Sequence, residues 1–382
     1  MQPFKTVNEL LAELPNAHNI VWQTGSLADY REAVMPFINR KIEGGGQVVY
    51  IHFSSCEPMF ENNPGIRTSE INLSHRFEAF TVDVTNVLGE DGDGVLYLFD
   101  ALSELQTAWA TDLMMENFFS VITPLIINNE SCAFFPLIRG RHSQSCVENI
   151  KKRTTRFFEL YSDFKNLYLR PCDLKGEEGA ALNVPYVFDQ EAQDFVQILD
   201  GVLESRFRKA MDLELRKVRN RSQDSWDQFF ERVQRDYEDG RDITEGCSRM
   251  TDIMMSRDEH IRRLLKKHFA PEDFFFVKEH MVGTGLIGGK ACGMLTARKI
   301  IENCCPEIYD RMEPHDSFFV GSDVFYTYIV ENGFWDMRVA QRTSEGYFAL
   351  ADDFSKALLS GSFSEKIEEE FITLLEYYGN SP

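Results

Sequence analysis

Four glycines crowd into one short stretch of the chain, directly before a lysine and a helical pattern. They are Gly283, Gly285, Gly288 and Gly289, and the lysine is Lys290. Glycine lets the backbone adopt positive φ and approach a ligand closely. The start of a helix offers free N–H groups and the positive end of a dipole, to which the lysine adds a mobile cation. These residue types in this order predict a site that binds phosphate.

Two nucleotide-binding motifs come close to this stretch, and neither fits it fully. Residues 283–288 match the dinucleotide pattern G-x-G-x-x-G, but that pattern directly follows a strand. Here a charged segment separates the candidate strand, residues 274–277, from the first glycine. The P-loop pattern requires glycine where Thr284 stands and a hydroxyl side chain where Ala291 stands. On spacing alone, a phosphate site and a flexible connector capped by a helix remain open alternatives.

A family resemblance favours the phosphate site. Residues 287–295 (IGGKACGML) resemble the G-G-K-x-x-x-L element that opens the nucleotide-binding domain of phosphoenolpyruvate synthases and pyruvate phosphate dikinases. Residues 314–325 resemble the P-P-G-F-x-I-T-x-x-A-Y segment of the same family, with Asp316 and Ser317 in place of its Pro-Gly pair. The resemblance covers residues 282 to about 338 and implies part of an ATP-grasp lobe.

The resemblance also implies an activity and a set of contacts. Enzymes of this family use magnesium-bound ATP to phosphorylate a histidine and then transfer the phosphoryl group to pyruvate or another acceptor. By resemblance, Gly288 and Gly289 form the turn that lets the backbone approach ATP, and Lys290 contacts a phosphate. The V-R-S-S-type segment, the phosphohistidine domain and the pyruvate-binding barrel of the family have no counterpart in the chain. We therefore expect an amino-terminal part of a longer phosphotransferase, inactive alone and without catalytic residues or metal ligands of its own.

Composition and charge argue against several classes of partner. The chain has 61 acidic and 40 basic residues and a net charge of −21, whereas nucleic acid binding requires a basic surface. The first residues are mixed and polar, and no apolar run reaches the ~18 residues that a membrane span needs. Eight scattered cysteines without C-x-x-C spacing indicate reduced thiols and a cytoplasmic protein.

The order of apolar runs and helical patterns predicts three parts. Near-continuous apolar strands that alternate with helices predict an α/β domain with a mainly parallel sheet over residues 1–175. Residues 175–183 are small, polar and glycine-rich, which is typical of a linker. Residues 184–272 predict a helical arm, and residues 273–382 a partial ATP-grasp lobe. The predicted strands are residues 19–24, 47–53, 94–100, 131–138, 167–170 and 317–320, and the predicted helices are residues 30–42, 111–127, 145–161, 324–331, 348–359 and 364–378.

The first domain resembles the RecA-like ATPases in its order and pattern. Residues 95–100 resemble their apolar strand that ends in a magnesium-associated aspartate, here Asp100. However, the first strand leads into residues 23–29, which contain one glycine and no lysine and so lack the phosphate contacts of a P-loop. We expect a degenerate nucleoside-triphosphatase fold used for partner contact or regulation. In that fold Asp100 is a structural residue at the strand end or a helix cap.

Other residues that could carry chemistry have plainer interpretations. Arg139, Arg141 and His142 follow a predicted strand, so they form either an anion site at the carboxyl edge of the sheet or an exposed basic loop. His52, also near a strand end, is interpreted as a core histidine. The basic run from Arg206 onwards predicts a solvated, salt-bridged helix face. Its members are Arg206, Arg208, Lys209, Arg216, Lys217, Arg219 and Arg221.

Three functions of different classes therefore stay open. The first is the amino-terminal part of a phosphotransferase. The second is a regulatory or scaffolding module whose RecA-like domain binds a protein partner, and the third is a nucleotide sensor without turnover. The sequence leaves the phosphoryl acceptor open and is compatible with a homo-oligomer, since RecA-like folds often self-associate.

Overall fold

The computed structural model describes residues 5–12, 17–54, 56–61, 63–109, 111–174, 182–218, 222–313 and 316–379. The chain forms two compact units, residues 1–225 and residues 226–382. The boundary falls within the segment 184–272 that the sequence predicted as one helical arm. Most of the expected linker (residues 175–181), Arg219 and Arg221 of the basic run, and residues 314–315 of the second family-like segment lie outside the described residues.

The first unit is built on one large sheet. Its strands are β1 (His18–Thr24), β2 (Val48–Phe53), β3 (Arg67–Ile71), β4 (Leu96–Phe99), β5 (Cys132–Ile138), β6 (Arg156–Ser162), β7 (Leu167–Leu174), β8 (Tyr186–Asp189) and β9 (Asp194–Gln197). Within the described residues they lie in the order β3-β2-β4-β5-β1-β6-β7-β8-β9. The strands from β3 to β6 pair in parallel, and β7, β8 and β9 continue the sheet antiparallel. The predicted α/β class with a mainly parallel sheet is therefore confirmed.

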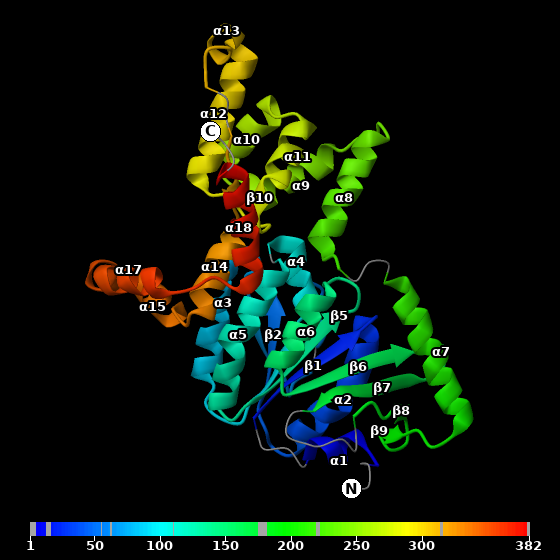
Figure 1. The fold of residues 1–382 in the computed structure, drawn as a ribbon. Helices are drawn as coiled ribbons and strands as arrows, with labels where there is room; N and C mark the ends of the chain where they lie inside the picture. Colours follow the sequence, from blue (N-terminus) through cyan, green and yellow to red (C-terminus); the bar gives the residue numbers. More distant parts are fainter. Residues whose placement is uncertain are drawn as a thin grey trace. The chain divides into compact units, whose positions relative to one another are not determined.

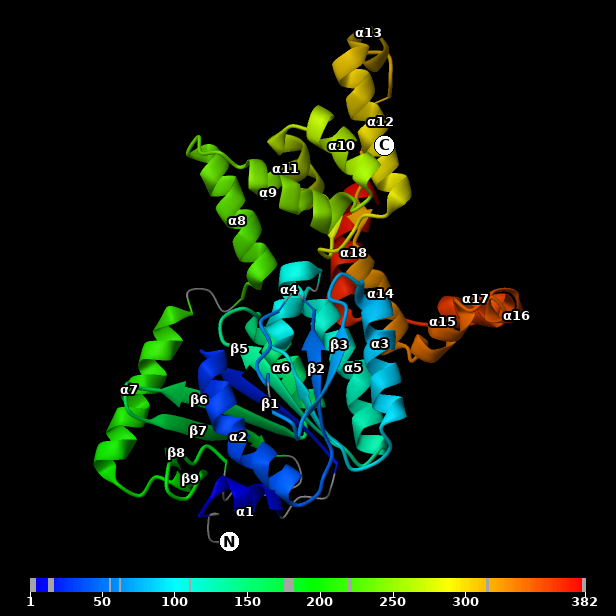
Figure 2. The same ribbon diagram turned by 180° about the vertical axis from the view of Figure 1, so that it is seen from behind.

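Helices cover both faces of this sheet, because parallel neighbours need crossover connections. The helices are α1 (Val7–Ala12), α2 (Leu27–Glu43), α3 (Phe77–Glu90), η1 (Leu102–Glu104), α4 (Leu105–Ala108), α5 (Asp112–Asn128), α6 (Gln144–Arg153) and α7 (Gly201–Lys217). One face carries α2, and the other carries α3, α5 and α6 (Figures 1 and 2). The carboxyl ends of β1, β2, β4 and β5 thus meet at one edge, where open α/β sheets place their ligands.

Trp22 fixes the central strand β1 in the core. Its side chain is fully buried. Its ring contacts Tyr30 of α2, Phe134 of β5 and Phe158 of β6, with ring centroids 6.3, 5.5 and 4.9 Å away. Aromatic pairs of this kind contribute about 0.5–1.5 kcal/mol each beyond their burial. One side chain therefore joins a covering helix to the strands on both sides of β1.

Helix α7 packs on the first unit rather than forming part of a separate arm. Phe207 and Ala210 are buried against Tyr161 of β6 and Tyr168 of β7. The sequence predicted a helical arm over residues 184–272, but Phe195 within it is buried in β9. The strands β8 and β9 have four residues each, so their pairing depends on the neighbouring sheet more than on local pattern.

The helix predicted over residues 145–161 is wrong in its second half. Helix α6 ends at Arg153, and Thr154 is already extended, with φ −92° and ψ 156°. Strand β6 follows, in which Phe157 and Phe158 are both fully buried. Successive side chains of a strand point to opposite faces, so two adjacent buried phenylalanines require a strand covered on both sides.

A partly buried ion pair joins β6 to β7. Glu159 pairs with Arg170 directly across the two strands, and it accepts hydrogen bonds from Arg170 Nε at 3.0 Å and from the Tyr161 hydroxyl at 2.6 Å. Burial raises the pKa of Glu159, but the Tyr161 hydrogen bond and the Arg170 charge outweigh it and hold the pKa below its ordinary value. The folded first unit therefore favours the ionised carboxylate.

We expect Glu159→Gln to lower the free energy of unfolding of the first unit by about 3 kcal/mol at neutral pH, because Arg170 loses its charge partner. Since the folded pKa is lowered, this contribution is present above the unfolded pKa of about 4.3 and is lost as the pH falls through the folded value. Urea unfolding followed between pH 7 and pH 3 should therefore show a shallower acid limb in the variant. Glu148→Gln, which breaks an exposed pair with Lys151, is the control and should change little. Equal acid limbs for Glu159→Gln and the unmodified protein would contradict the assignment.

The second unit is mainly helical. Its helices are α8 (Ser225–Glu238), α9 (Thr244–Met250), η2 (Thr251–Met255, a π-helical turn), α10 (Glu259–His268), α11 (Pro271–Glu279), α12 (Gly289–Cys304), α13 (Pro306–Tyr309), α14 (Ser322–Glu331), α15 (Trp335–Gln341), α16 (Gly346–Ala349), α17 (Ala351–Ser360) and α18 (Glu365–Gly379). Two short strands, β10 (Met281–Val282) and β11 (Phe319–Val320), pair in parallel. The main apolar core contains Trp226 and Phe230 of α8, Met254 of η2 and Phe274 of α11. Helices predicted at residues 324–331 and 364–378 are confirmed as α14 and α18, and most of residues 348–359 forms α17.

The strand suggested for residues 274–277 is a helix, α11. Pro271 occupies its first position, where the fixed φ of proline suits a helix and its missing N–H is not needed. The Asp273 carboxylate accepts a hydrogen bond from the Ala270 N–H at 2.6 Å and so caps the helix start. These local signals decide in favour of helix although the segment itself is almost entirely apolar.

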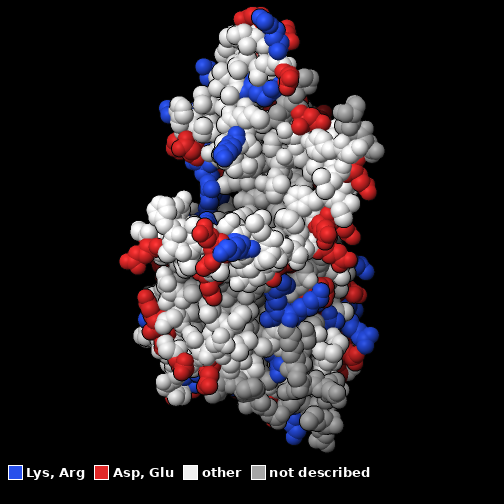
Figure 3. Space-filling model, turned by 60° about the vertical axis from the view of Figure 1, so that its left-hand side comes forward, with Lys and Arg blue, Asp and Glu red and all other residues white. Residues whose placement is uncertain are grey.

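Figure 3 shows one face of the molecule, coloured by charge. Acidic and basic side chains are interspersed on the face drawn in Figure 3, although the chain as a whole carries −21. None of the described helices is long and apolar enough to cross a membrane.

Candidate functional site

A glycine-rich turn joins β10 to α12 in the second unit. Gly283 and Gly288 have φ of 79° and 83°, in the left-handed region that favours glycine. Helix α12 begins at Gly289, so Lys290 is its second residue. The strand that leads into the turn is β10, which the sequence did not predict. The helix predicted after the glycines is therefore present. The strand before the turn is the two-residue β10 rather than residues 274–277.

Asp323, the second residue of α14, fills the inner side of the turn. Its carboxylate accepts hydrogen bonds from the N–H groups of Thr284 at 3.0 Å, Gly285 at 3.1 Å and Val324 at 3.0 Å, and the residue is 1% exposed. A Cβ at Gly285 would lie 2.5 Å from Ser322 Oγ, so only glycine allows this approach. The first half of the turn therefore binds the protein's own carboxylate.

The second half of the turn faces outward. Gly288, Gly289 and Lys290 are all exposed, and among the described residues Lys290 forms no ion pair. At this end the Cys292 N–H donates to the Gly288 carbonyl at 3.0 Å, so the N–H groups of α12 before Cys292 belong to the open helix end. A lysine at the positive end of a helix dipole is electrostatically unfavourable, and an anion beside it would offset this penalty.

The sequence identified Lys290 and its glycines but missed Asp323. The local signal for Asp323 is the run Gly-Ser-Asp before a helical pattern, since Ser and Asp are frequent at helix starts. The backbone groups that it caps lie some forty residues earlier in the chain, which local pattern does not reveal.

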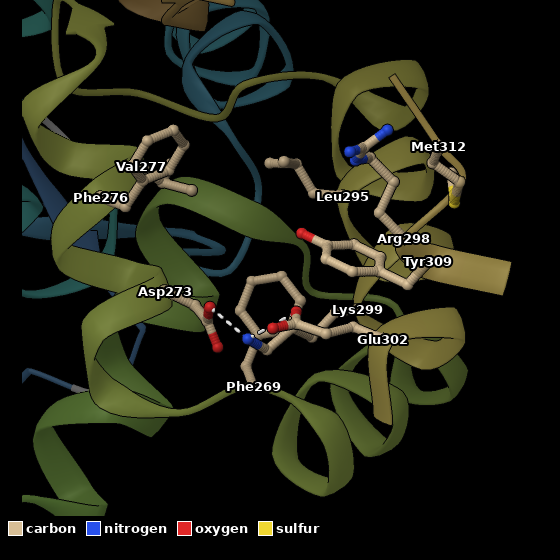
Figure 4. A pocket seen from close by; sticks show the side chains of 10 residues that line it. All are labelled: Phe269, Asp273, Phe276, Val277, Leu295, Arg298, Lys299, Glu302, Tyr309 and Met312. Atoms are coloured by element: carbon tan, nitrogen blue, oxygen red, sulfur yellow. Dashed lines mark ion pairs between the residues drawn. The ribbon is translucent and has the colours of Figure 1, made fainter. Parts of the chain in front are cut away.

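A cavity of about 490 Å³ opens further along α12, between α11, α12 and α13 (Figure 4). Lys299 points across it and forms ion pairs with Asp273 and Glu302, each at 2.9 Å. Arg298 lies over the Tyr309 ring at 5.6 Å and donates to the Glu313 carbonyl at 3.0 Å. Lys290 does not line this cavity, so the outward glycines and the cavity are separate places on one helix.

In the first unit, the loop after β1 stands where a P-loop would be expected. Glu214 of α7 lies against this loop, and a Cβ at Gly25 would overlap with its Oε2. The same carboxylate is 3.5 Å from Arg139 Nη1. A carboxylate in contact with the backbone at Gly25 repels an anion electrostatically.

Asp100, at the end of β4, is held by β2. Its carboxylate accepts hydrogen bonds from the Phe53 N–H at 2.7 Å and from the Tyr50 hydroxyl, and it lies 2.8 Å from His52 Nδ1. Burial raises the pKa of Asp100, and these three partners oppose that shift. The alternative of a helix cap is wrong, because Ala101 is the residue before η1 and no side-chain cap is present there. Asp100 is a strand-end residue, and His52 is its partner.

The basic residues after β5 are all paired, and the side chains of Arg139 and His142 are buried while that of Arg141 is 41% exposed. Arg139 lies over the Tyr161 ring at 4.2 Å beside Glu214, and Arg141 pairs with Glu104 at 3.0 Å. His142 Nδ1 lies 2.9 Å from an Asp112 carboxylate oxygen. This segment is therefore neither an exposed basic loop nor a ready anion site.

Comparison with known proteins adds no identity. No family model matches the chain, and no curated protein matches it.

Proposed function

We propose that the chain is an amino-terminal part of a phosphoenolpyruvate synthase-like phosphotransferase, in which Gly288, Gly289 and Lys290 contact the phosphates of ATP. The second unit would then form part of an ATP-grasp lobe. In the complete enzyme, ATP bound with Mg²⁺ would phosphorylate a carrier histidine, and pyruvate or another acceptor would receive the phosphoryl group. The proposal assigns phosphate contact, and no chemical step, to the residues of this chain.

One observation carries the proposal: an exposed lysine follows two exposed glycines at the start of a long helix. The glycines leave room for a ligand against the backbone. The helix start and the ammonium group both favour an anion there. The resemblance of residues 287–295 to the family's G-G-K element names that anion as a nucleotide phosphate.

For the first unit we propose a RecA-like fold that serves partner contact or regulation and does not bind nucleotide. The central place of β1 in a parallel sheet supports the fold. Glu214 against Gly25 and the hydrogen-bonded Asp100 support the loss of nucleotide binding. We also propose a cytoplasmic location, supported by eight free cysteines. We propose that the first unit self-associates, and only its resemblance to RecA-like folds supports this.

An acyl phosphate of ATP tests the proposal, because this probe transfers its acyl group to amines that lie beside the terminal phosphate. We expect acylation of Lys290, suppressed by excess magnesium-bound ATP, as read by mass spectrometry of the digested chain. The covalent label accumulates even when equilibrium binding is weak.

Lys267 serves as the internal control. It is an exposed lysine in the last turn of α10, in the same unit, and so lies at the C-terminal end of its helix rather than the N-terminal end. Its labelling should be low and unaffected by ATP. ATP-protected labelling within residues 1–225, or none at Lys290, would contradict the proposal.

A further inference from the structure

Three side chains with metal-binding atoms converge beyond the carboxyl end of β5 in the first unit. Asp112 begins α5, His142 lies in the loop after β5, and Cys146 lies in α6. One oxygen, one imidazole nitrogen and the sulfur of these residues all lie within 4.8 Å of one another. His142 and Cys146 are buried, and the Asp112 side chain is 14% exposed. No function discussed above uses these residues.

We propose that Asp112, His142 and Cys146 bind a structural Zn²⁺ ion. Carboxylate oxygen, imidazole nitrogen and thiolate sulfur are the ligands that zinc takes in proteins. In a tetrahedral zinc site such atoms lie about 3.3–3.8 Å apart, given metal–ligand bonds of about 2.0–2.3 Å. His142 Nδ1 and Asp112 Oδ1 are 2.9 Å apart, so the two need to separate by only a few tenths of an ångström.

Gln106 supplies the fourth position. Its amide nitrogen lies 3.1 Å from His142 Nδ1 and 3.2 Å from Asp112 Oδ1, and its amide oxygen lies 3.0 Å from Ser225 Oγ. Amide oxygen and nitrogen have nearly the same shape, so half a turn of the amide directs Oε1 at the metal. The amide nitrogen then donates to Ser225 Oγ, whose own proton still reaches the Arg141 carbonyl at 2.9 Å. The turn therefore keeps the contact between the Gln106 amide and Ser225, while the bonds to His142 and Asp112 are replaced by the metal.

Neighbouring hydroxyl groups orient the ligands, as outer partners do at zinc sites. Ser103 Oγ lies 2.9 Å from His142 Nε2, which holds the ring so that Nδ1 faces Asp112. The Ser143 N–H and hydroxyl both donate to Asp112 Oδ2, at 2.8 and 2.6 Å. This leaves Asp112 Oδ1 directed at the centre of the cluster.

Charge also favours a divalent cation here. Glu116 and Asp224 lie close enough to act electrostatically on Cys146, in addition to Asp112. On binding, the Cys146 thiol releases one proton to solvent, and the imidazole proton passes from Nδ1 to Nε2 by exchange with water. One thiolate and one carboxylate among the ligands then balance the charge of Zn²⁺.

Co²⁺ titration of the chelator-treated chain tests the proposal, because Co²⁺ takes zinc sites and gives a thiolate-to-metal charge-transfer band in the near ultraviolet. We expect one Co²⁺ per chain, this band, and its loss when Zn²⁺ is added. Cys146→Ser should abolish the band. Cys292→Ser, which removes an equally buried thiol of the second unit, should leave it unchanged.

Ser103→Ala is a second variant that keeps all four ligands. We expect it to weaken Co²⁺ binding about 10- to 100-fold through loss of the outer hydrogen bond, with an unchanged circular dichroism spectrum. Absence of the band in the unmodified chain, its persistence in Cys146→Ser, or unchanged affinity in Ser103→Ala would each overturn the proposal. If hydrogen bonds alone join Asp112, His142 and Cys146 and no metal binds there, the unmodified chain will show no band.

Discussion

Under the proposed function, replacing Lys290 by alanine is expected to abolish ATP-dependent phosphorylation by the phosphotransferase while leaving its fold intact. The lysine is exposed and makes no core contact, so its removal leaves no cavity. Loss of one preorganised charge beside a transferring phosphoryl group costs about 100- to 1,000-fold in rate. Transfer of label from radioactive ATP to protein measures the effect, and circular dichroism checks the fold.

Lys290→Arg keeps the charge but alters the geometry, because a planar guanidinium does not replace a compact ammonium. It should recover part of the activity. Lys267→Ala, a matched exposed lysine on α10, should retain full activity. Near-normal activity in Lys290→Ala would show that the glycine-rich turn is only a connector.

Replacing Asp323 by alanine is expected to open the turn from the inside. Three backbone N–H groups lose their acceptor, and each buried donor left unpaired costs about 1–3 kcal/mol. We therefore expect about 3 kcal/mol or more of local stability to be lost. Hydrogen–deuterium exchange of peptides that cover residues 281–290 should accelerate by about 100-fold or more, at 1.4 kcal/mol for each factor of ten.

Peptides of the first unit serve as the internal control in this experiment, and their exchange should not change. Asp323→Asn keeps one acceptor oxygen and should give an intermediate rate. Asp336→Ala removes an exposed carboxylate of the same unit and should have no effect on the turn. Unaltered exchange in Asp323→Ala would mean that the glycines hold their conformation without this carboxylate.

Elements with a continuous local pattern could be predicted, and those fixed by distant partners could not. The strands β1, β2, β4 and β5 are buried on both faces, so their apolar runs identify them directly. The sequence predicts a helix over residues 156–161, where the structure has β6, because adjacent buried aromatics fit both periods. Residues 274–277 show the opposite failure, since the deciding signals, Pro271 and Asp273, lie at the helix start outside the apolar run.

The same division holds for the sites. Glycine spacing and a helix pattern located Lys290, because both signals are local. Asp323, Glu214 and the convergence of Asp112, His142 and Cys146 depend on which elements become neighbours in the fold. Only the sheet order and the packing of α7 bring these residues to their partners.

The carboxylate of Glu214 against Gly25 determines how a nucleotide site could be engineered into the first unit. Rewriting residues 23–29 as a P-loop would leave the carboxylate in place, and an added lysine would pair with it before meeting any phosphate. Removing Glu214 as well would deprive Arg139 of its charge partner beside the Tyr161 ring. That guanidinium, 5% exposed at its side chain and 3.3 Å from the Gln23 carbonyl, would then lie beside the loop without its charge partner. A designer would therefore begin with α7, and only afterwards change the loop.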